Sequence, residues 1–401
     1  MQVFERTLAV AAALLTLSGV AMADEYGPGI TNTEIKIGNI NPYSGPVSAF
    51  AANGMVAIAY FNMINAQGGI NGRKINMISL DDGYSPPRTV EQTRKLVEDD
   101  GVFAMFGLNG TPGNLAVQKY LNAKKIPQIL SLSGSSALLN PKQYPWTTSL
   151  YPTFDVEGRI LARYVLQVKP DAKIAVIYQH DNFGEEFLKG FEKGLGAKAK
   201  TMIVKTASYE LSDPMVDSQV TELQGSGADT LFTAATPKFA AQAIRKVHDL
   251  GWKPLHLLIS EASSIGATLT PAGLSNAVGI VTAAAFKTPL DPTWDKDEGM
   301  QEFIAFMKKW NPQGKIDDIS AETGYITSVM MVRILSECGN NLTRSNLLEH
   351  ATNIPPTSLP VLLPGVTISM TPTDYEAFKT LRMVRFDGER WVMIGDPVSV
   401  K

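Results

Sequence analysis

Residues 35–72 read IKIGNINPYSGPVSAFAANGMVAIAYFNMINAQGGING: a short apolar strand, a polar turn, a long apolar helix and a glycine-rich turn. The polar turn at 41–46 opens the helix, where the first backbone N–H groups lack intrahelical partners. Such a point attracts a carboxylate, a phosphate or an amide oxygen. The stretch therefore predicts a strand–turn–helix unit of an α/β fold. It leaves open whether the turn holds a ligand, a cofactor or nothing.

The first 23 residues have the features of a signal peptide. Arg6 supplies a positive charge, residues 8–17 form an apolar core, and Ala-Met-Ala at 21–23 fits a small-x-small cleavage site. The apolar core is too short to span a bilayer. We therefore expect a protein exported by a cleaved signal peptide, with a periplasmic location if the source is Gram-negative.

Composition narrows the class of protein further. Cys338 is the single cysteine, so an internal disulfide cannot form and the exported fold relies on its core. A chain of 43.4 kDa is large enough to bury such a core, divided between two domains. The net charge of −3 supplies no basic surface, so we expect no nucleic-acid partner.

After the leader, apolar strand patterns alternate with helical patterns. The expected strands cover 35–40, 74–80, 102–106, 128–130, 174–178, 202–205, 230–233, 257–259 and 279–282. The expected helices cover 49–66, 88–99, 115–124, 156–168, 185–195, 213–225 and 239–250. This alternation predicts doubly wound parallel sheets with helices on both faces, in two domains that part near 144–155. The tail from 380 to 400 predicts a hairpin around Asp387-Gly388.

Parallel sheets bind ligands beyond the carboxyl ends of their strands. The loops that follow the expected strands are rich in Ser, Thr, Gly and Asn and poor in basic residues; they cover 41–50, 108–113, 131–136, 179–183, 235–237 and 260–262. This mixture suits a neutral or singly charged small molecule better than a polyphosphate.

Motifs for catalysis or for a cofactor are absent from the sequence. It contains no G-x-S-x-G, no H-E-x-x-H, no G-x-G-x-x-G after the first strand and no Walker lysine. The pair Asp81-Asp82 at a strand end could bind a metal ion. More commonly such a pair belongs to a solvated turn or caps a helix. We therefore expect neither an enzyme, nor a cofactor, nor a metal.

Four segments, in this order, match a known family: 44–47 (SGPV), 64–72 (INAQGGING), Asp81-Asp82, and 183–185 (FGE). On these motifs the chain resembles the periplasmic leucine/isoleucine/valine-binding proteins, the ligand-capturing subunits of ABC importers. The resemblance runs from Thr33 to the C-terminus. It implies a small-molecule ligand, an ABC permease of the inner membrane as partner, and a monomer.

The resemblance also implies the type I periplasmic-binding fold, in which two α/β lobes joined by a three-segment hinge close on the ligand. The crossings would fall near Pro152, Lys287 and Thr371. The amino-terminal lobe would then comprise 24–152 and 287–371, and the carboxy-terminal lobe 153–286 and 372–401.

Ligand contacts are carried over from the family position by position. Phe50 falls at an aromatic wall, Thr111 and Ser135 at hydroxyls that hold a ligand carboxylate, and Ser133 at a backbone contact. Phe183 and Thr236 replace tyrosines of the family, and Glu261 falls where a carboxylate pairs with the α-ammonium.

Some features of the family are missing from the sequence. A second carboxylate expected near 152–153 is not evident, and Asp155 is close but misaligned. Tyr84 and Gly110 stand near the positions of a disulfide found in the family.

A buried Glu261 without a cation would be costly, so it indicates either an ammonium ligand or a protonated acid that donates to an uncharged group. We expect an apolar or branched-chain amino acid as ligand. An aromatic carboxylate, an amide or a urea-like molecule is the alternative. Phe50 and Phe183 could instead belong to the core. The same clamp could also serve as a sensor for a membrane receptor.

Overall fold

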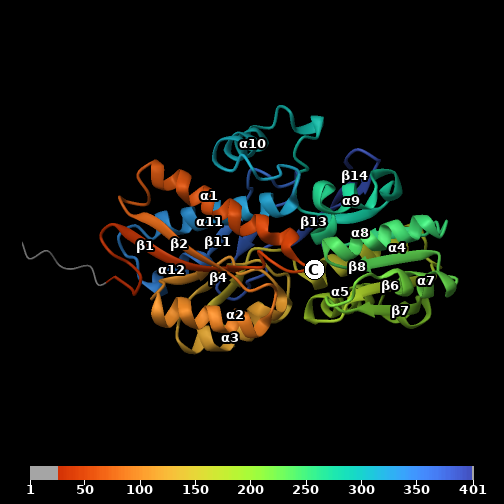
Figure 1. Cartoon of the computed structure of the whole chain (residues 1–401), viewed down its shortest axis with the longest axis horizontal. Coiled ribbons are helices and arrows are strands. Elements are labelled where there is room, and N and C mark those ends of the chain that lie inside the picture. Colours follow the sequence, from red (N-terminus) through yellow and green to blue (C-terminus); the bar gives the residue numbers. More distant parts are fainter. Residues whose placement is uncertain (1–25, 400–401) are drawn as a thin grey trace, which may run out of the picture.

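A computed structural model describes residues 26–399, and the signal peptide expected at 1–23 lies outside them (Figure 1). The strands are β1 (Glu34–Asn41), β2 (Lys74–Asp81), β3 (Ala104–Phe106), β4 (Gln128–Ser131), β5 (Thr147–Ser149), β6 (Ile174–Gln179), β7 (Ile203–Tyr209), β8 (Thr230–Ala234), β9 (Leu255–Leu258), β10 (Val281–Ala284), β11 (Ile354–Thr357), β12 (Ile368–Met370), β13 (Thr380–Phe386) and β14 (Trp391–Ser399).

The helices are α1 (Ala51–Ala66), α2 (Pro86–Arg94), α3 (Thr111–Ala123), α4 (Phe154–Val168), α5 (Asn182–Leu195), α6 (Ala199–Met202), α7 (Asp217–Gly225), α8 (Pro237–Asp249), α9 (Thr270–Ala272), α10 (Glu298–Trp310), α11 (Ile319–Glu337) and α12 (Arg344–Thr352). Two α/β lobes result, each built on one sheet (Figure 1). The prediction of two doubly wound parallel-sheet lobes is therefore confirmed.

The first sheet has the order β2-β1-β3-β4-β5, and all of its strand pairs are parallel. Helices α1 and α11 pack together on one face, and α2 and α3 pack together on the other (Figure 1). Strands β3 and β4 are buried along their whole length, as expected for the centre of a sheet covered on both faces.

The second sheet has the order β14-β13-β10-β9-β8-β6-β7. Its strands β6 to β10 run parallel, and the hairpin β13–β14 adds an antiparallel edge. Helices α4 and α5 approach closely because glycines form their contact. A Cβ atom at Gly190 would lie 2.8 Å from Asp155 Cα, and one at Gly158 would lie 2.7 Å from Phe191 N.

The chain passes between the two sheets after β5, after β10 and after β12. The second crossing runs beside the segment that joins β11 to β12. Lys287 N donates to Val361 O at 2.8 Å, and Leu363 N donates to Ala285 O at 2.9 Å. The exact residue boundaries of the two lobes, as given above, stay a prediction.

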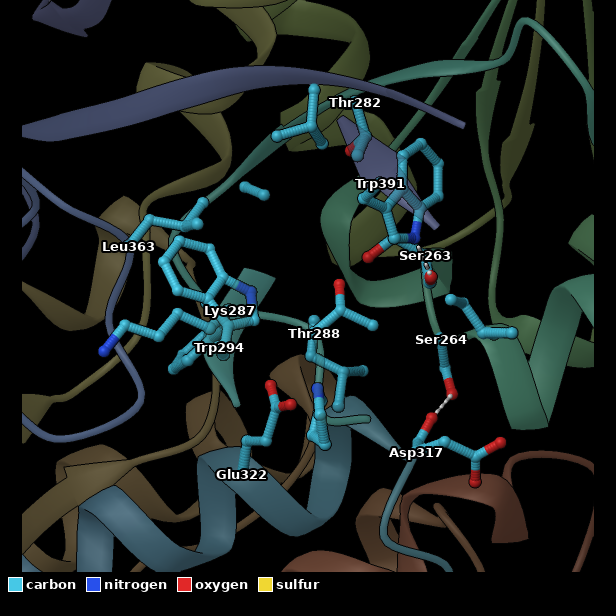
Figure 2. Close-up of a pocket in the computed structure, with 16 residues that line it drawn as sticks. Ser263, Ser264, Thr282, Lys287, Thr288, Trp294, Asp317, Glu322, Leu363 and Trp391 are labelled. Atoms are coloured by element: carbon cyan, nitrogen blue, oxygen red, sulfur yellow. Dashed lines mark hydrogen bonds between the residues drawn. The ribbon is translucent and has the colours of Figure 1, made fainter. Parts of the chain in front are cut away.

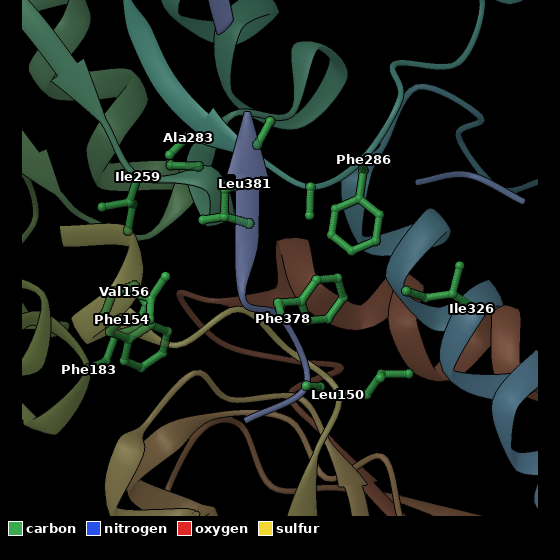
Figure 3. Packing of buried hydrophobic residues seen from close by; sticks show 14 of the residues in the cluster. Leu150, Phe154, Val156, Phe183, Ile259, Ala283, Phe286, Ile326, Phe378 and Leu381 are labelled. Carbon is green, nitrogen blue, oxygen red and sulfur yellow. The ribbon is translucent and has the colours of Figure 1, made fainter. Parts of the chain in front are cut away.

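Apolar side chains continue from one lobe into the other at these crossings (Figure 3). Phe286 and Phe378 belong to two different crossings, and their ring centroids lie 6.2 Å apart. Leu150 lies at the first crossing and belongs to the same buried cluster. The crossings therefore share one packed core.

The structure differs from the sequence expectations mainly between 290 and 380, where α10, α11, α12, β11 and β12 had no predicted counterpart. Helix α3 begins at Thr111 instead of 115, because Pro112 is well tolerated in a first helical turn. Within residues 26–399, no helix combines the length and the apolar character needed to cross a membrane.

Candidate functional site

A cavity with about 420 Å³ of empty space, part of it open to solvent, lies between the two lobes. Five of the seven predicted ligand contacts line it: Phe50, Thr111, Ser133, Phe183 and Glu261. The remaining lining residues are Asn53, Tyr84, Asn109, Gly110, Leu132, Tyr151, Phe154, Ser320 and Thr323. The cavity therefore sits at the carboxyl ends of β3, β4, β6 and β9, where parallel sheets commonly bind ligands.

One side of the cavity is suited to an anion. Thr111 is the first residue of α3, and its hydroxyl lies 2.8 Å from the hydroxyl of Ser133. Both side chains are buried. The start of a 13-residue helix adds free N–H groups and a partial positive charge. The two hydroxyls and the helix start can together hold a carboxylate.

The walls of the cavity are aromatic. The rings of Phe183 and Phe154 meet edge to face, with their centroids 5.3 Å apart. The ring of Phe187 packs against both of them. Tyr84 adopts a left-handed backbone conformation with φ 63°. Its ring lies over Gly110, where a Cβ atom would be 2.7 Å away. Tyr84 and Gly110 are thus neighbours.

The opposite side carries a buried pair of carboxyl groups. Glu157 Oε1 accepts from Ser260 N at 2.6 Å, and its Oε2 accepts from Ser260 Oγ at 2.7 Å. Glu261 Oε1 is buried and has no hydrogen-bond partner among the described residues. Burial raises the pKa of Glu157 to about 8, and burial with the nearby Glu157 raises the pKa of Glu261 well above its usual range. Glu261 therefore places at the cavity a carboxyl oxygen that has no hydrogen-bond partner among the described residues.

The resemblance implies a second carboxylate near 152–153 that helps to hold the ligand ammonium. The structure places Asp155 elsewhere, in ion pairs with Arg159 and Lys193. Glu157, two residues further along α4, stands next to Glu261 instead, behind the lining of the cavity.

The carboxyl pair makes stability depend on pH. The pKa of Glu157 is near 8 in the folded protein and 4.5 in the unfolded chain. Between these two pH values the folded protein therefore binds more protons than the unfolded chain. The contribution of the protonated Glu157 to the free energy of unfolding is complete below pH 4.5, and it is lost as the pH rises through about 8. We expect the urea midpoint to fall between about pH 5 and about pH 8, and to fall less in Glu261→Gln. Equal slopes for both proteins would contradict this assignment.

Ser135 is placed differently from the ligand contact that the resemblance implies. Its hydroxyl donates to Glu186 Oε1 at 2.5 Å, and Ser136 N donates to Glu186 Oε2 at 3.0 Å. Glu186 belongs to α5 of the other lobe, so these two bonds join the lobes across the cleft. Ser135 is not among the residues that line the cavity, and its hydroxyl is engaged by a carboxylate of the protein itself.

Thr236 also lies outside the lining residues. It is buried at the start of α8, where its hydroxyl donates to Gln179 Oε1 at 3.2 Å and lies 3.3 Å from the Tyr209 hydroxyl. It supports the loops of its own lobe. The roles of all seven residues in ligand binding stay predictions.

The bonds of Glu186 lead to a prediction about closure. Replacing Glu186 with glutamine removes a charged acceptor of two hydrogen bonds that exist only when the lobes are together. We expect ligand affinity to fall by roughly tenfold and the radius of gyration of the ligand-free protein to rise. Calorimetry and small-angle scattering measure these two quantities.

Glu185→Gln is the matched control for that prediction, because Glu185 is the preceding residue and, within residues 26–399, its side chain pairs only with Lys189 of its own helix. An equal loss of affinity in both variants would show that the cross-lobe bonds do not favour closure.

Asp81 and Asp82 hold turns. Asp81 accepts from Ser44 N and Ser44 Oγ, and Asp82 accepts from Tyr84 N and Thr89 Oγ1. Among residues 26–399, no group of His, Cys, Asp and Glu has an arrangement that could hold a metal ion.

Sequence reasoning missed several lining residues. Asn109 stood in one of the nominated loops, and Tyr84 follows the strand end at 81–82, so both could have been found by position. Ser320 and Thr323 come from α11, which the sequence pattern did not predict.

The sequence profile of the periplasmic binding protein family matches residues 34–390. A leucine/isoleucine/valine-binding protein homologue of Brucella melitensis is 27% identical over 252 residues, which are 61% of this chain and 66% of that relative, just under two thirds of its length.

Solved structures agree in fold. A branched-chain amino acid ABC transporter protein of Thermus thermophilus with bound valine has a TM-score of 0.82 at 18% identity, over 92% of this chain and 98% of that chain. An ABC transporter solute-binding protein of Rhodopseudomonas palustris in complex with 3,4-dihydroxybenzoic acid has a TM-score of 0.76 at 18% identity. The match covers 91% of this chain and 97% of that chain.

The two lobes and the cavity between them define the type I fold of two-lobed binding proteins. The family profile matches most of the length of this chain, so the chain belongs to the periplasmic binding protein family. It is similar to members of the leucine/isoleucine/valine-binding type. Members of this family bind solutes, and the family is periplasmic.

Proposed function

We propose that the protein is the solute-binding protein of an ABC importer and captures an apolar or branched-chain α-amino acid between its lobes. The ligand carboxylate would lie at the start of α3, against the hydroxyls of Thr111 and Ser133. The ammonium would lie against Glu261, and the apolar side chain would lie between Phe50 and Phe183. These groups match the three parts of an apolar amino acid.

The unmet Oε1 of Glu261 is the observation that carries this proposal. A buried carboxyl oxygen without a partner is costly, and an ammonium group supplies both a hydrogen bond and a charge. Glu157 strengthens the case, because two adjacent carboxyls attract a cation more strongly than one.

Closure of the lobes would complete the site. Thr111 and Ser133 belong to the first lobe, whereas Phe183 and Glu261 belong to the second, so a ligand that touches all four favours the closed form. Closing also excludes water, which strengthens each polar contact. We further propose that the closed surface is what an inner-membrane permease recognises and that the mature protein is a periplasmic monomer.

A thermal-shift screen of the apolar amino acids against aromatic acids tests the class of ligand. A ligand at about 100 times its Kd should add about 2.7 kcal/mol of stability. The proposal expects leucine, isoleucine or valine to give the largest shift. A screen in which no amino acid shifts the unfolding temperature would contradict it.

An aromatic carboxylate is the second candidate for the ligand, because many aromatic side chains line the cavity. Phe50, Tyr84, Tyr151 and Phe183 can enclose a flat ring, and a protonated Glu261 can donate to a hydroxyl or a carbonyl. The relative from Rhodopseudomonas palustris was solved with such an acid. Stabilisation by 3,4-dihydroxybenzoate but by no amino acid would favour this candidate.

The same clamp could report to a membrane receptor instead of a permease. A permease gene beside the gene for this protein would support the importer, and a receptor kinase gene would support the sensor.

A further inference from the structure

A second cavity, with about 490 Å³ of empty space, part of it open to solvent, lies on the hinge side of the lobes (Figure 2). The crossing segment from Ala284 to Pro289 forms one wall. Helix α11 of the first lobe forms another, and Ser263, Ser264 and Trp391 of the second lobe complete it. The cavity therefore touches both lobes and the chain that joins them.

This hinge-side cavity is separate from the ligand cavity described above. The two share no lining residue. The first turn of α11 stands between them, because Ser320 and Thr323 line the ligand cavity while Ile319 and Glu322 line the hinge-side cavity. The chain after β9 divides them in the same way, with Glu261 on one side and Ser263 on the other.

Glu322 extends from α11 into the hinge-side cavity (Figure 2). Its side chain is buried, and its Oε1 has no hydrogen-bond partner among the described residues. Burial, with a smaller effect of the nearby Asp318, raises the pKa of Glu322 well above its usual range. A carboxyl group in this state lacks the partner that buried acids require.

Lys287 and Trp391 are already engaged, whereas Thr282 Oγ1 is buried without a hydrogen-bond partner among the described residues. Lys287 Nζ, the nearest cation, contacts both carboxylate oxygens of Asp297 at 2.7 Å and Pro360 O at 2.8 Å. Trp391 Nε1 donates to Ser263 O at 2.9 Å. The carboxyl groups of Glu322 and Asp317 both line the cavity, so an incoming cation is favoured over an anion.

The rest of the lining is largely aromatic and apolar, with Phe286, Trp294, Trp391, Leu363 and Val384. Figure 2 shows Trp294 and Glu322 on the same side of the cavity. Aromatic faces attract organic cations, and their attraction grows when water is excluded. A carboxyl group beside indole and phenyl rings is suited to an ammonium group attached to an apolar body.

We propose that the hinge-side cavity binds a small organic ammonium compound, with its charge on Glu322 and its apolar body against Trp294, Trp391 and Phe286. Because the cavity is formed by both lobes and a crossing segment, a bound ammonium compound would favour one arrangement of the lobes and so alter affinity at the ligand cavity. The proposal does not depend on which ligand the other cavity takes.

The test uses the mature protein and three probes of similar shape: phenethylamine, 2-phenylethanol and 3-phenylpropanoate. Calorimetry gives affinity, and tryptophan fluorescence reports on the cavity through Trp294 and Trp391. We expect phenethylamine to bind and the neutral and anionic probes to bind at least about 30-fold more weakly. Glu322→Gln, which keeps the size of the side chain, should weaken phenethylamine binding about 30-fold while leaving affinity for the other cavity's ligand within about twofold.

Two further variants locate the bound probe. Thr288→Phe fills the hinge-side cavity from the crossing segment and should abolish phenethylamine binding, whereas Glu261→Gln alters the ammonium position of the ligand cavity and should not change it. The proposal is overturned if phenethylamine does not bind, if 2-phenylethanol binds equally well, or if Glu322→Gln binds phenethylamine as tightly as the wild type.

Discussion

Glu261→Gln should weaken the binding of a branched-chain amino acid by roughly 2–5 kcal/mol, which is the usual effect of removing one member of a buried ion pair. The amide keeps the shape of the carboxyl group but cannot pair with an ammonium charge. In the ligand-free protein the same change removes a buried acid that has no partner for its Oε1. The free energy of unfolding near neutral pH should therefore stay equal or rise.

This opposite response of binding and stability distinguishes a binding role from a structural one. Calorimetry and urea unfolding of the same sample measure both quantities. Glu192→Gln, on the exposed side of α5, is the control and should change neither. If Glu261→Gln binds the amino acid normally, Glu261 does not hold the ammonium group.

Phe187→Ala should lower the free energy of unfolding by roughly 3–5 kcal/mol, the usual cost of removing a fully buried phenyl ring. Phe187 is fully buried, and its ring centroid lies 4.5 Å from that of Phe154 and 5.4 Å from that of Phe183. Both neighbours line the ligand cavity. The loss should therefore also weaken ligand binding in molecules that remain folded, because the aromatic wall loses its support.

Urea unfolding checks the first effect of Phe187→Ala, and calorimetry below the unfolding transition checks the second. Phe187→Leu is the matched variant, since leucine retains most of the apolar volume and should cost less. A midpoint for Phe187→Ala equal to that of the wild type would show that the wall does not depend on this ring.

Much of the site could be predicted because parallel strands bring their carboxyl ends to one edge of a sheet. Thr111, Ser133 and Glu261 each follow such a strand, so knowing the strands was enough to place them near one another. Residues contributed by helices were harder to predict. Helix α11 is buried on most of its surface and shows no clear apolar stripe, so the sequence pattern did not predict it or its Ser320 and Thr323.

Contacts between the lobes could not be predicted from local sequence. Ser135 stands in a nominated loop, and its hydroxyl is chemically suited to a ligand carboxylate. In the structure this hydroxyl donates to Glu186 of α5, a contact with the other lobe that local sequence does not reveal. Glu157 was missed for a related reason, since its position beside Glu261 depends on how α4 packs against the loop after β9. The turn at 41–46 contacts Asp81 through Ser44 N and Ser44 Oγ, which local sequence also did not reveal.

The measurement that tests the proposed ligand most directly compares leucine with its two half-analogues, 4-methylpentanoate and isoamylamine, by calorimetry on the wild-type protein. The first analogue lacks the ammonium group and the second lacks the carboxylate. If the hydroxyls of Thr111 and Ser133 hold one end and Glu261 holds the other, leucine should bind at least about 100-fold more tightly than either analogue. Equal or tighter binding of 4-methylpentanoate, or binding of 3,4-dihydroxybenzoate in preference to leucine, would contradict the assignment of an amino acid as the ligand.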